Sequence, residues 1–177
     1  GVLPRDTKFP STTATWYQFD FPAGWEASKY DEWSFYRQAI MKICNDIKAV
    51  DILAVDSTGT AWLIEVKDYR THPRTKAMDL CDEICRKVLD TLAAMLPARF
   101  NASNGPERAM AQSVLQSSRL RVVLHLEQPL SGSLSPAINP ANILLKLKQK
   151  LRPIDADPRV VNIAGITRTR SLGWTVR

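Results

Sequence analysis

Three charged residues, Asp51, Glu65 and Lys67, lie within an otherwise largely apolar stretch of the chain, VDILAVDSTGTAWLIEVKDYR, residues 50–70. Carboxylate oxygens are ligands that Mg²⁺ prefers, and an ammonium group beside them can orient an attacking water or stabilise negative charge that develops on a phosphoryl group. Carboxylates that are buried without partners would cost several kcal/mol. The three residues therefore indicate either a metal site for phosphodiester hydrolysis or a local network of ion pairs.

The stretch is predicted to form two antiparallel strands joined by a loop at residues 57–59. Three-residue hairpin loops commonly end in a left-handed residue, and Gly59 suits that position. The resulting register places Asp51 opposite Glu65, with Lys67 next along the same face. A two-residue loop would shift the register and separate the two carboxylates. We prefer the longer loop because it makes the pairs of the other face wholly apolar: Val50 with Val66, Ile52 with Ile64, and Ala54 with Trp62.

Helices are expected on both sides of this hairpin. Ser28 and Asp31 form a capping-box pattern at the start of a helix that we expect to extend to about Cys44. Apolar residues at helical spacing predict a second helix over residues 75–96. Further helices are predicted after Asn104 and from Asn139 to about Leu151, and strands at residues 120–127, 159–166 and 173–177. This order predicts an α/β fold in which α-helices flank a mixed β-sheet.

The length of 177 residues suits one domain with a buried core. Residues 1–27, rich in proline and aromatic side chains, are predicted to form an extended arm that packs on a single α/β domain over residues 28–177. No apolar run reaches the roughly 18 residues of a membrane span, and the first residues lack the pattern of a secretory signal. Three cysteines argue against a disulfide framework. We therefore expect a cytoplasmic protein.

Asp51 followed after the turn by Glu65-Val66-Lys67 resembles the PD-(D/E)XK nuclease superfamily, whose members share the restriction-endonuclease-like fold. The resemblance covers residues 28–127 and implies a helix-strand-strand-strand-helix-strand core. It implies that Asp51 and Glu65 bind Mg²⁺, for which Mn²⁺ can substitute, with the carbonyl of Val66 as a further ligand. It also implies that Lys67 is the catalytic lysine.

The chain departs from the pattern of this superfamily in two places. Val50 stands where the superfamily has its eponymous proline, and the strand expected before the Asp51 strand is short or merged with it. Some members also use an acidic residue on the first helix. Glu32 is the best candidate for that role in this chain, and Glu26 is the next.

The excess positive charge of the chain, formally +6, lies in its C-terminal region, residues 146–177. A basic surface of this kind is typical of proteins that contact the backbone of nucleic acids. A lysine-rich solvated helix face followed by an arginine-containing tail is the alternative reading. The candidate nucleic-acid contacts are Arg70 and Arg74 after the Lys67 strand, and Lys146, Lys148, Lys150, Arg168 and Arg170 in the C-terminal region.

The function predicted from these features is metal-dependent hydrolysis of nucleic acid, by an endo- or exonuclease, with DNA preferred over RNA. A homodimer or partner proteins are compatible with this prediction, and a membrane partner is not expected. The alternative is a catalytically inactive nuclease-fold subunit that binds nucleic acid or serves assembly. In that case Glu65 would form a structural ion pair with Lys67 or Arg70 at the end of the hairpin.

Overall fold

The computed structural model of the chain describes residues 11–14, 17–129, 138–169 and 172–177 and contains a mixed sheet of five strands. The strand order is β3-β4-β5-β6-β7. The first three strands are antiparallel to one another, and β5, β6 and β7 are parallel. The strands are β3 (Glu26–Lys29), β4 (Ile52–Val55), β5 (Thr60–Asp68), β6 (Arg119–Glu127) and β7 (Arg159–Val161).

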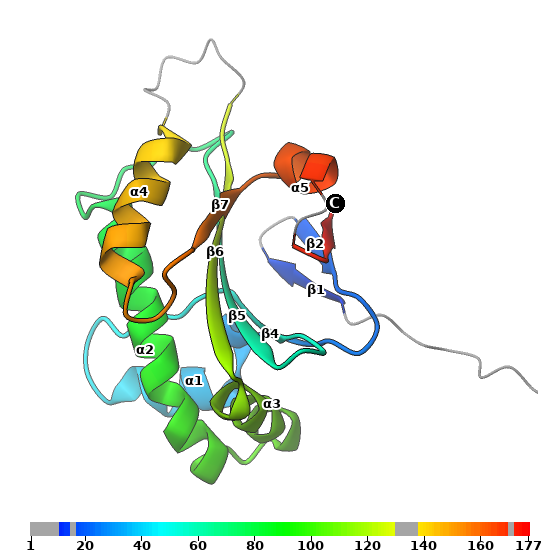
Figure 1. Cartoon of the computed structure of the whole chain (residues 1–177). Helices are drawn as coiled ribbons and strands as arrows, with labels where there is room; N and C mark the ends of the chain where they lie inside the picture. Colours follow the sequence, from blue (N-terminus) through cyan, green and yellow to red (C-terminus); the bar gives the residue numbers. More distant parts are fainter. Residues whose placement is uncertain (1–10, 15–16, 130–137, 170–171) are drawn as a thin grey trace, which may run out of the picture.

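One face of the sheet is covered by helices (Figure 1). The long helix α2 (Leu80–Asn101) packs between α3 (Gly105–Gln116) and α4 (Pro140–Leu151). Their apolar residues form the larger core with the inward face of β4, β5 and β6. No helix in the described part of the chain is long and apolar enough to cross a membrane. The mixed α/β fold and its flanked mixed sheet are thus as predicted.

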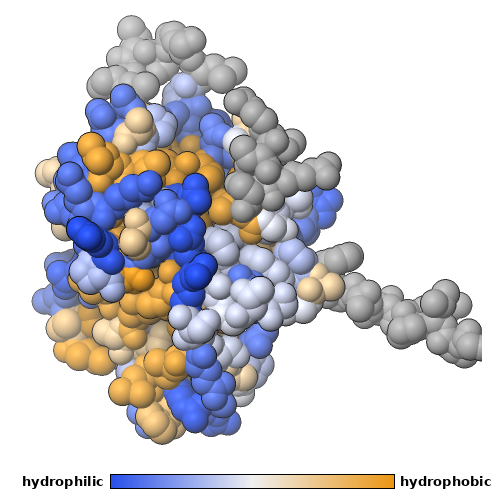
Figure 2. Space-filling view, viewed as in Figure 1, coloured by the Kyte–Doolittle hydropathy of each residue, from blue (hydrophilic) through white to orange (hydrophobic). Residues whose placement is uncertain are grey.

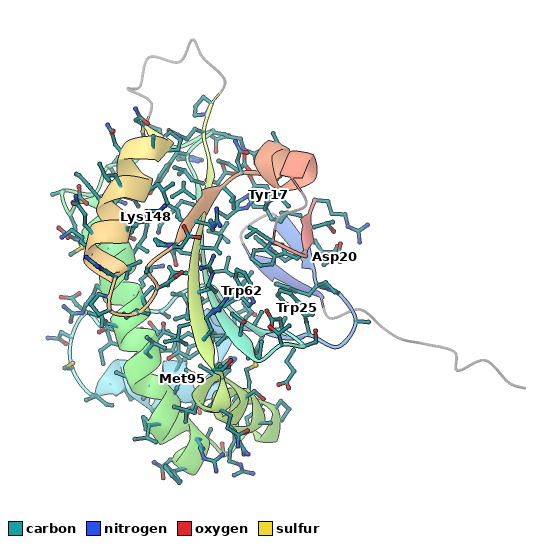
Figure 3. All side chains as sticks on the ribbon, in the orientation of Figure 1. Tyr17, Asp20, Trp25, Trp62, Met95 and Lys148 are labelled. Atoms are coloured by element: carbon teal, nitrogen blue, oxygen red, sulfur yellow. The ribbon has the colours of Figure 1, made fainter. Side chains whose placement is uncertain are left out.

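The opposite face of the sheet carries a second, smaller sheet. It has the order β1-β2-β8, from β1 (Ser11–Ala14), β2 (Tyr17–Asp20) and β8 (Thr175–Val176), and α5 (Ile163–Thr169) lies beside it. Residues of β2 and β8 form a second core with the outward face of the main sheet. Trp25 and Trp62 stack there at 5.9 Å between ring centroids (Figure 3). Part of the predicted arm is therefore a strand pair in this second layer, and β3 continues from it into the main sheet.

The register of the β4–β5 hairpin agrees with the prediction. Ile52 pairs with Ile64 and Leu53 with Leu63. The loop closes through hydrogen bonds of Asp56, and Gly59 has a φ of +78°, a conformation that favours glycine. Val50 is an exception, because it precedes β4 and lies in the helix-side core instead of facing Val66.

The helix predicted from Ser28 to Cys44 is wrong. Ser28 belongs to β3, where it pairs with Leu53, and its hydroxyl accepts a hydrogen bond from the indole N–H of Trp33 instead of capping a helix. Only short helical turns follow: η1 (Tyr30–Glu32), α1 (Ser34–Gln38) and η2 (Ile40–Lys42). Pairing with β4 outweighs the local capping pattern, so the strand expected before Asp51 exists and the first helix lies between these two strands.

Other boundaries also differ from the sequence prediction. Helix α2 begins at Leu80, five residues later than predicted, because the Asp79 side chain caps it by accepting a hydrogen bond from the Cys81 N–H at 2.8 Å. The predicted strand at residues 159–166 ends at Val161, and α5 begins two residues later. Asn104 and Asn139 cap α3 and α4 as predicted.

Candidate active site

The three predicted residues lie at one end of the β4–β5 hairpin. Asp51 directly precedes β4, and its Oδ2 accepts a hydrogen bond from the backbone N–H of Val66 at 2.7 Å. Glu65 and Lys67 are alternate residues of β5, so both side chains lie on the sheet face that packs against α2. The Lys67 Nζ lies 2.9 Å from Glu65 Oε1. The structure therefore brings the predicted acids and amine together.

Glu65 is the buried centre of this cluster, with 1% of its surface exposed. Its Oε1 accepts from two ammonium groups, Lys87 at 2.6 Å and Lys67 at 2.9 Å. Its Oε2 is buried and has no hydrogen-bond partner among the described residues. Burial, followed by the negative charge of Asp51, raises the pKa of Glu65 to about 7 against the opposing effect of the two lysines.

Two residues of α2 that were not predicted from the sequence, Glu83 and Lys87, complete the cluster. They are one helical turn apart and lie beside the buried residues Ile84 and Val88. Lys87 contacts Glu65, as described above. Both residues could have been suspected from the sequence, because they are charged and adjoin the apolar face of a predicted helix. Such positions lie close to the sheet.

Glu83 contacts three cationic side chains, although only 1% of its surface is exposed. Its carboxylate lies 2.6 Å from Arg74, 2.7 Å from Lys76 and 3.0 Å from Lys67. Burial by itself would raise the pKa of Glu83, but the hydrogen bonds from Lys76, Lys67 and Arg74 outweigh it and hold that pKa far below its usual range. Glu83 therefore stays ionised and holds the Lys67 side chain in place.

Lys67 joins the two carboxylates, since its Nζ bonds to both Glu65 and Glu83. Burial would lower the pKa of Lys67, but the charges and hydrogen bonds of Glu65 and Glu83 together raise it. The side chain is a fixed cation at neutral pH. It can stabilise negative charge or orient a water through its N–H groups, but it is not arranged to act as a base in this state.

The acidic residue that approaches Asp51 from the preceding segment is Asp31. Its Oδ1 is buried without a hydrogen-bond partner in the described structure, and burial, followed by the charge of Asp51, raises its pKa. Glu32, the residue favoured by the sequence analysis, is exposed and pairs with Lys29 at 2.8 Å. Glu26, the second choice, accepts a hydrogen bond from Ser113 of α3. The structure brings neither glutamate to the cluster.

The cluster has features that a divalent cation fits. Oε2 of Glu65 and Oδ1 of Asp31 are buried without hydrogen-bond partners, and the charge of Asp51 acts on both residues, so a further cation would stabilise them. The described residues contain no group of three or more His, Cys, Asp and Glu side chains poised as a metal site. Mg²⁺ commonly uses only one or two carboxylates together with waters and substrate oxygens. The carbonyl of Val66 remains a predicted ligand.

Most of the residues predicted to contact nucleic acid form ion pairs with carboxylates of this chain. Arg70 forms an ion pair with Asp68 at 2.8 Å, and Arg74 holds Glu83 and is half-buried. The three lysines of α4 are exposed but each lies near an aspartate: Lys146 near Asp79, Lys148 near Asp157 and Lys150 near Asp82, at 2.7–3.3 Å. Arg170 and the side chain of Arg168 lie outside the described residues. Exposed ion pairs are weak, so the lysines can still exchange partners.

A second polar cluster lies on the other face of the same strands. Asp68 accepts hydrogen bonds from the Tyr17 hydroxyl at 2.9 Å and from Arg70. The Arg70 hydrogen bond is the main reason that the pKa of Asp68 falls to about 2. Glu127 accepts from the Ile163 N–H at 2.6 Å, and its Oε1 lies 3.0 Å from Nε2 of the buried His125 without the alignment of a hydrogen bond. Both carboxylates of this cluster are satisfied by donors.

Comparison with known proteins finds a similarity to part of a longer protein. No family model matches the chain, and no solved structure matches it. The chain is 30% identical over 198 aligned residues to a cysteine–tRNA ligase from Neisseria meningitidis serogroup A. The alignment covers 89% of this chain but 28% of the ligase, so the chain spans little more than a quarter of that relative.

Proposed function

We propose that this chain is a Mg²⁺-dependent hydrolase of phosphodiester bonds in nucleic acid, with a restriction-endonuclease-like core. One observation carries the proposal. A buried glutamate, Glu65, has one oxygen without a hydrogen-bond partner beside Asp51, while its other oxygen is held by two lysines. A carboxylate whose charge is disfavoured by burial and held in a fixed orientation is typical of a functional site.

The topology supports this proposal. Three antiparallel strands, β3, β4 and β5, are followed by helix α2 and then by β6, which is parallel to β5. The PD-(D/E)XK superfamily implies the same succession of three strands, helix and strand. Its first helix would precede these strands, whereas α1 lies between β3 and β4. The candidate residues lie at the end of the β4–β5 hairpin, where the resemblance to the superfamily requires them.

Each residue of the site has a separable role in the proposed reaction. Asp51 and Glu65 would hold Mg²⁺, which when bound supplies Lewis-acid polarisation and an activated water. Asp31 would lower the cost of bringing a cation to the buried carboxylates. Lys67, fixed by Glu83, would orient the attacking water and stabilise negative charge on the phosphoryl oxygens.

The proposed substrate is nucleic acid, with DNA preferred over RNA. The relative found by comparison is a tRNA ligase by name, so tRNA joins single-stranded and duplex DNA as a substrate to test. Ligation of cysteine to tRNA is not assigned to this chain, because the alignment covers 28% of the ligase.

Cleavage assays with matched variants test the proposal. Plasmid, single-stranded DNA and tRNA are incubated with Mg²⁺ or with a chelator, using wild type, Asp51→Ala, Lys67→Ala and Glu32→Gln. We expect metal-dependent cleavage that the first two variants lose and that Glu32→Gln keeps, because Glu32 lies outside the cluster. Equal cleavage by wild type, Asp51→Ala and Lys67→Ala would indicate a contaminant and defeat the proposal.

The second candidate is a non-catalytic nucleic-acid-binding or assembly subunit, and the ion pairs of Glu65 favour it. Lys87 and Lys67 already neutralise Glu65 without a metal. In this case the wild type would bind nucleic acid but would not cleave it with Mg²⁺ or Mn²⁺. The same assays, read together with a binding measurement, separate the two candidates.

A further inference from the structure

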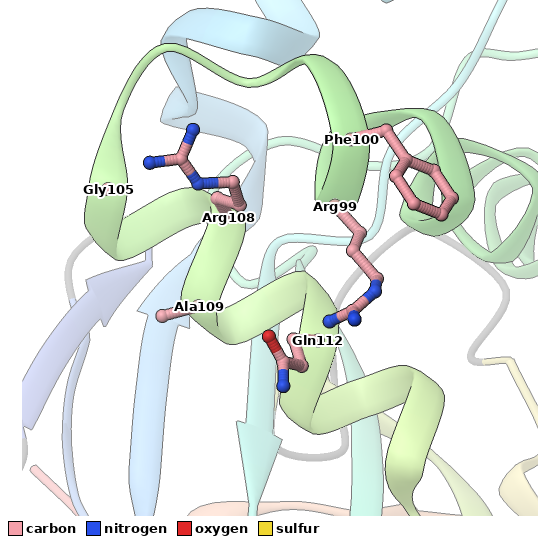
Figure 4. A pocket seen from close by; sticks show the side chains of 6 residues that line it. All are labelled: Arg99, Phe100, Gly105, Arg108, Ala109 and Gln112. Carbon is pink, nitrogen blue, oxygen red and sulfur yellow. The ribbon is translucent and has the colours of Figure 1, made fainter.

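A pocket at the corner between α2 and α3 combines an exposed aromatic ring with two arginines. It has a volume of about 280 Å³ and is lined by Arg99, Phe100, Gly105, Arg108, Ala109 and Gln112 (Figure 4). Glu83 of the candidate active site lies near the other end of α2. At 1.5 Å per residue, Glu83 and Arg99 are about 24 Å apart along the helix, so the pocket is separate from the candidate active site.

The two arginines of the pocket differ from the C-terminal lysines because they have no carboxylate partner in the described structure. Arg99 lies over the ring of Phe100, with 5.8 Å from its guanidinium carbon to the ring centroid. Arg108 donates to the backbone carbonyl of Ala102 at 3.3 Å. The neighbouring carboxylate, Glu107, is turned away and accepts hydrogen bonds from Ser34 and Phe35 of α1. Two guanidinium groups thus remain available for an anion.

Phe100 offers an apolar face beside these charges. Its side chain is 67% exposed, although it follows the well-buried Ala98 at the end of α2. Hydrophobic residues also reach the surface elsewhere over the helical layer (Figure 2), including Leu89 and Leu96 of the same helix. A ring that carries a cation on one side and is exposed to solvent is suited to stacking, since base–aromatic stacking and Arg–π contact occur together in single-strand sites.

We propose that this pocket binds one nucleotide of a single-stranded nucleic acid, with phosphate at Arg99 and Arg108 and the base stacked on Phe100. An apolar protein partner fits less well, because it would have to bury two guanidinium groups that lack carboxylate partners. A nucleotide supplies both the anion and the aromatic ring. The volume is near the lower end of small-ligand sites, which suits one nucleotide and not a long groove.

The inference rests on the proposed function only in taking nucleic acid as the ligand. A strand held at this pocket and at the candidate active site would bridge about 24 Å along α2. At 3.4 Å per nucleotide of a stacked strand, this separation corresponds to about seven nucleotides. The pocket would therefore add affinity for strands longer than this without contributing to the chemistry.

Binding measured without cleavage tests the inference. Fluorescence anisotropy of a labelled 20-nucleotide single strand, as DNA and as RNA, is recorded in chelator across a series of salt concentrations. The variants are Arg99→Ala with Arg108→Ala, and Phe100→Leu. The matched control is Lys146→Ala with Lys150→Ala, which removes the same charge from paired lysines. Melting curves verify that each variant is folded.

We expect the double arginine variant to reduce the salt slope of log affinity by about 0.7, the value for one neutralised phosphate of a single strand. Phe100→Leu is expected to weaken binding about tenfold, because leucine keeps the apolar surface but cannot stack. The lysine control should change both quantities less than the arginine variant. An arginine variant with unchanged affinity and salt slope, or an unchanged affinity with Phe100→Leu, would overturn the nucleotide assignment.

These outcomes are separable from failure of the proposed function. The binding assay contains chelator, so its outcome does not depend on metal at the candidate active site. If cleavage proves absent while the arginine and Phe100 variants still weaken binding, the pocket remains a nucleic-acid site on a non-catalytic protein. If Phe100→Leu instead changes the sedimentation of the protein alone and leaves binding intact, the face is a protein contact and the inference is wrong.

Discussion

Neighbouring residues of β5 take part in two polar clusters that lie on opposite faces of the same sheet. The cluster on the α2 side contains Glu65, which has one buried oxygen without a partner and a pKa raised to about 7. The cluster on the small-sheet side contains Asp68, whose two oxygens are both engaged and whose pKa falls to about 2. Glu65 and Asp68, three residues apart on β5, thus differ in whether both carboxylate oxygens have a hydrogen-bond partner.

This contrast distinguishes the two clusters better than burial does. Both clusters are largely shielded from solvent, and both contain basic side chains. On the small-sheet side both carboxylates, Asp68 and Glu127, accept hydrogen bonds, whereas the ring nitrogens of the buried His125 have no partner among the described residues. On the α2 side two carboxylate oxygens, Oε2 of Glu65 and Oδ1 of Asp31, are left without hydrogen-bond partners, a condition that costs free energy and that a bound cation would relieve.

The largest expected effect is on catalysis. Asp51→Ala should lower the rate of nucleic-acid cleavage roughly 100- to 1,000-fold, because it removes a proposed cation-holding and charge-stabilising group. Asp68→Asn, on the opposite face, should leave the rate nearly unchanged. Initial rates on the cleaved substrate, with protein concentrations matched by folded fraction, provide the measurement. Comparable losses in the two variants would remove the functional distinction between the faces.

The next effect is the coupling between Glu65 and Lys87, whose charged groups are 2.6 Å apart in a buried site. A double-mutant cycle with Glu65→Gln and Lys87→Met should give a coupling free energy of roughly 1–3 kcal/mol in urea denaturation. The exposed pair Lys150–Asp82 serves as the control and should give less than about 1 kcal/mol. A coupling no larger than that of the control would mean that Lys87 does not hold Glu65 in solution.

The two clusters should also have opposite effects on the pH dependence of stability. The folded state keeps the Glu65 proton after the unfolded chain has lost it, because the pKa rises from 4.5 to about 7, so this residue makes folding less favourable as pH rises through that range. For Asp68 the pKa falls from 3.8 to about 2, so its stabilisation is present above 3.8 and is lost as pH falls toward 2.

Free energies of unfolding measured from pH 2 to pH 8 check this expectation. Glu65→Gln should flatten the loss of stability between pH 4.5 and pH 7, and Asp68→Asn should flatten the loss between pH 4 and pH 2. The Asp68 effect should be the smaller, because solvent screens its ion pair with the exposed Arg70. Parallel curves for wild type and Glu65→Gln between pH 4.5 and pH 7 would refute the raised pKa.

The smallest expected effect concerns only the cluster on the small-sheet side. Tyr17→Phe removes the hydroxyl that donates to Asp68 and should destabilise the protein by about 1 kcal/mol, the usual net value of one hydrogen bond. Cleavage should not change. Thermal or urea unfolding measures the first expectation, and a reduced cleavage rate at full folding would show that the small-sheet side takes part in function.

The hairpin could be predicted from sequence because its information is local. Alternation of apolar residues and a glycine that requires positive φ define the β4–β5 register, which places Glu65 and Lys67 on one face. The capped starts of α3 and α4 were predictable for the same reason.

The rest of the site depends on tertiary contacts. Ser28 and Asp31 form a capping pattern, but pairing with β4 draws Ser28 into a strand and turns Asp31, rather than Glu32, toward Asp51. Lys87 reaches Glu65 only because α2 packs on β5 in one particular rotation. Such contacts follow from packing between distant segments, so periodicity could indicate the buried face of α2 but not which acid its lysine would bind.

Metal binding by the α2-side cluster is the central claim, and titration of Mn²⁺ into the protein tests it most directly. Isothermal calorimetry compares wild type, Glu65→Gln and Asp68→Asn. We expect wild type and Asp68→Asn to bind Mn²⁺ alike, and Glu65→Gln to bind it about tenfold more weakly or worse. Absence of binding to wild type, or equal binding to all three proteins, would contradict it.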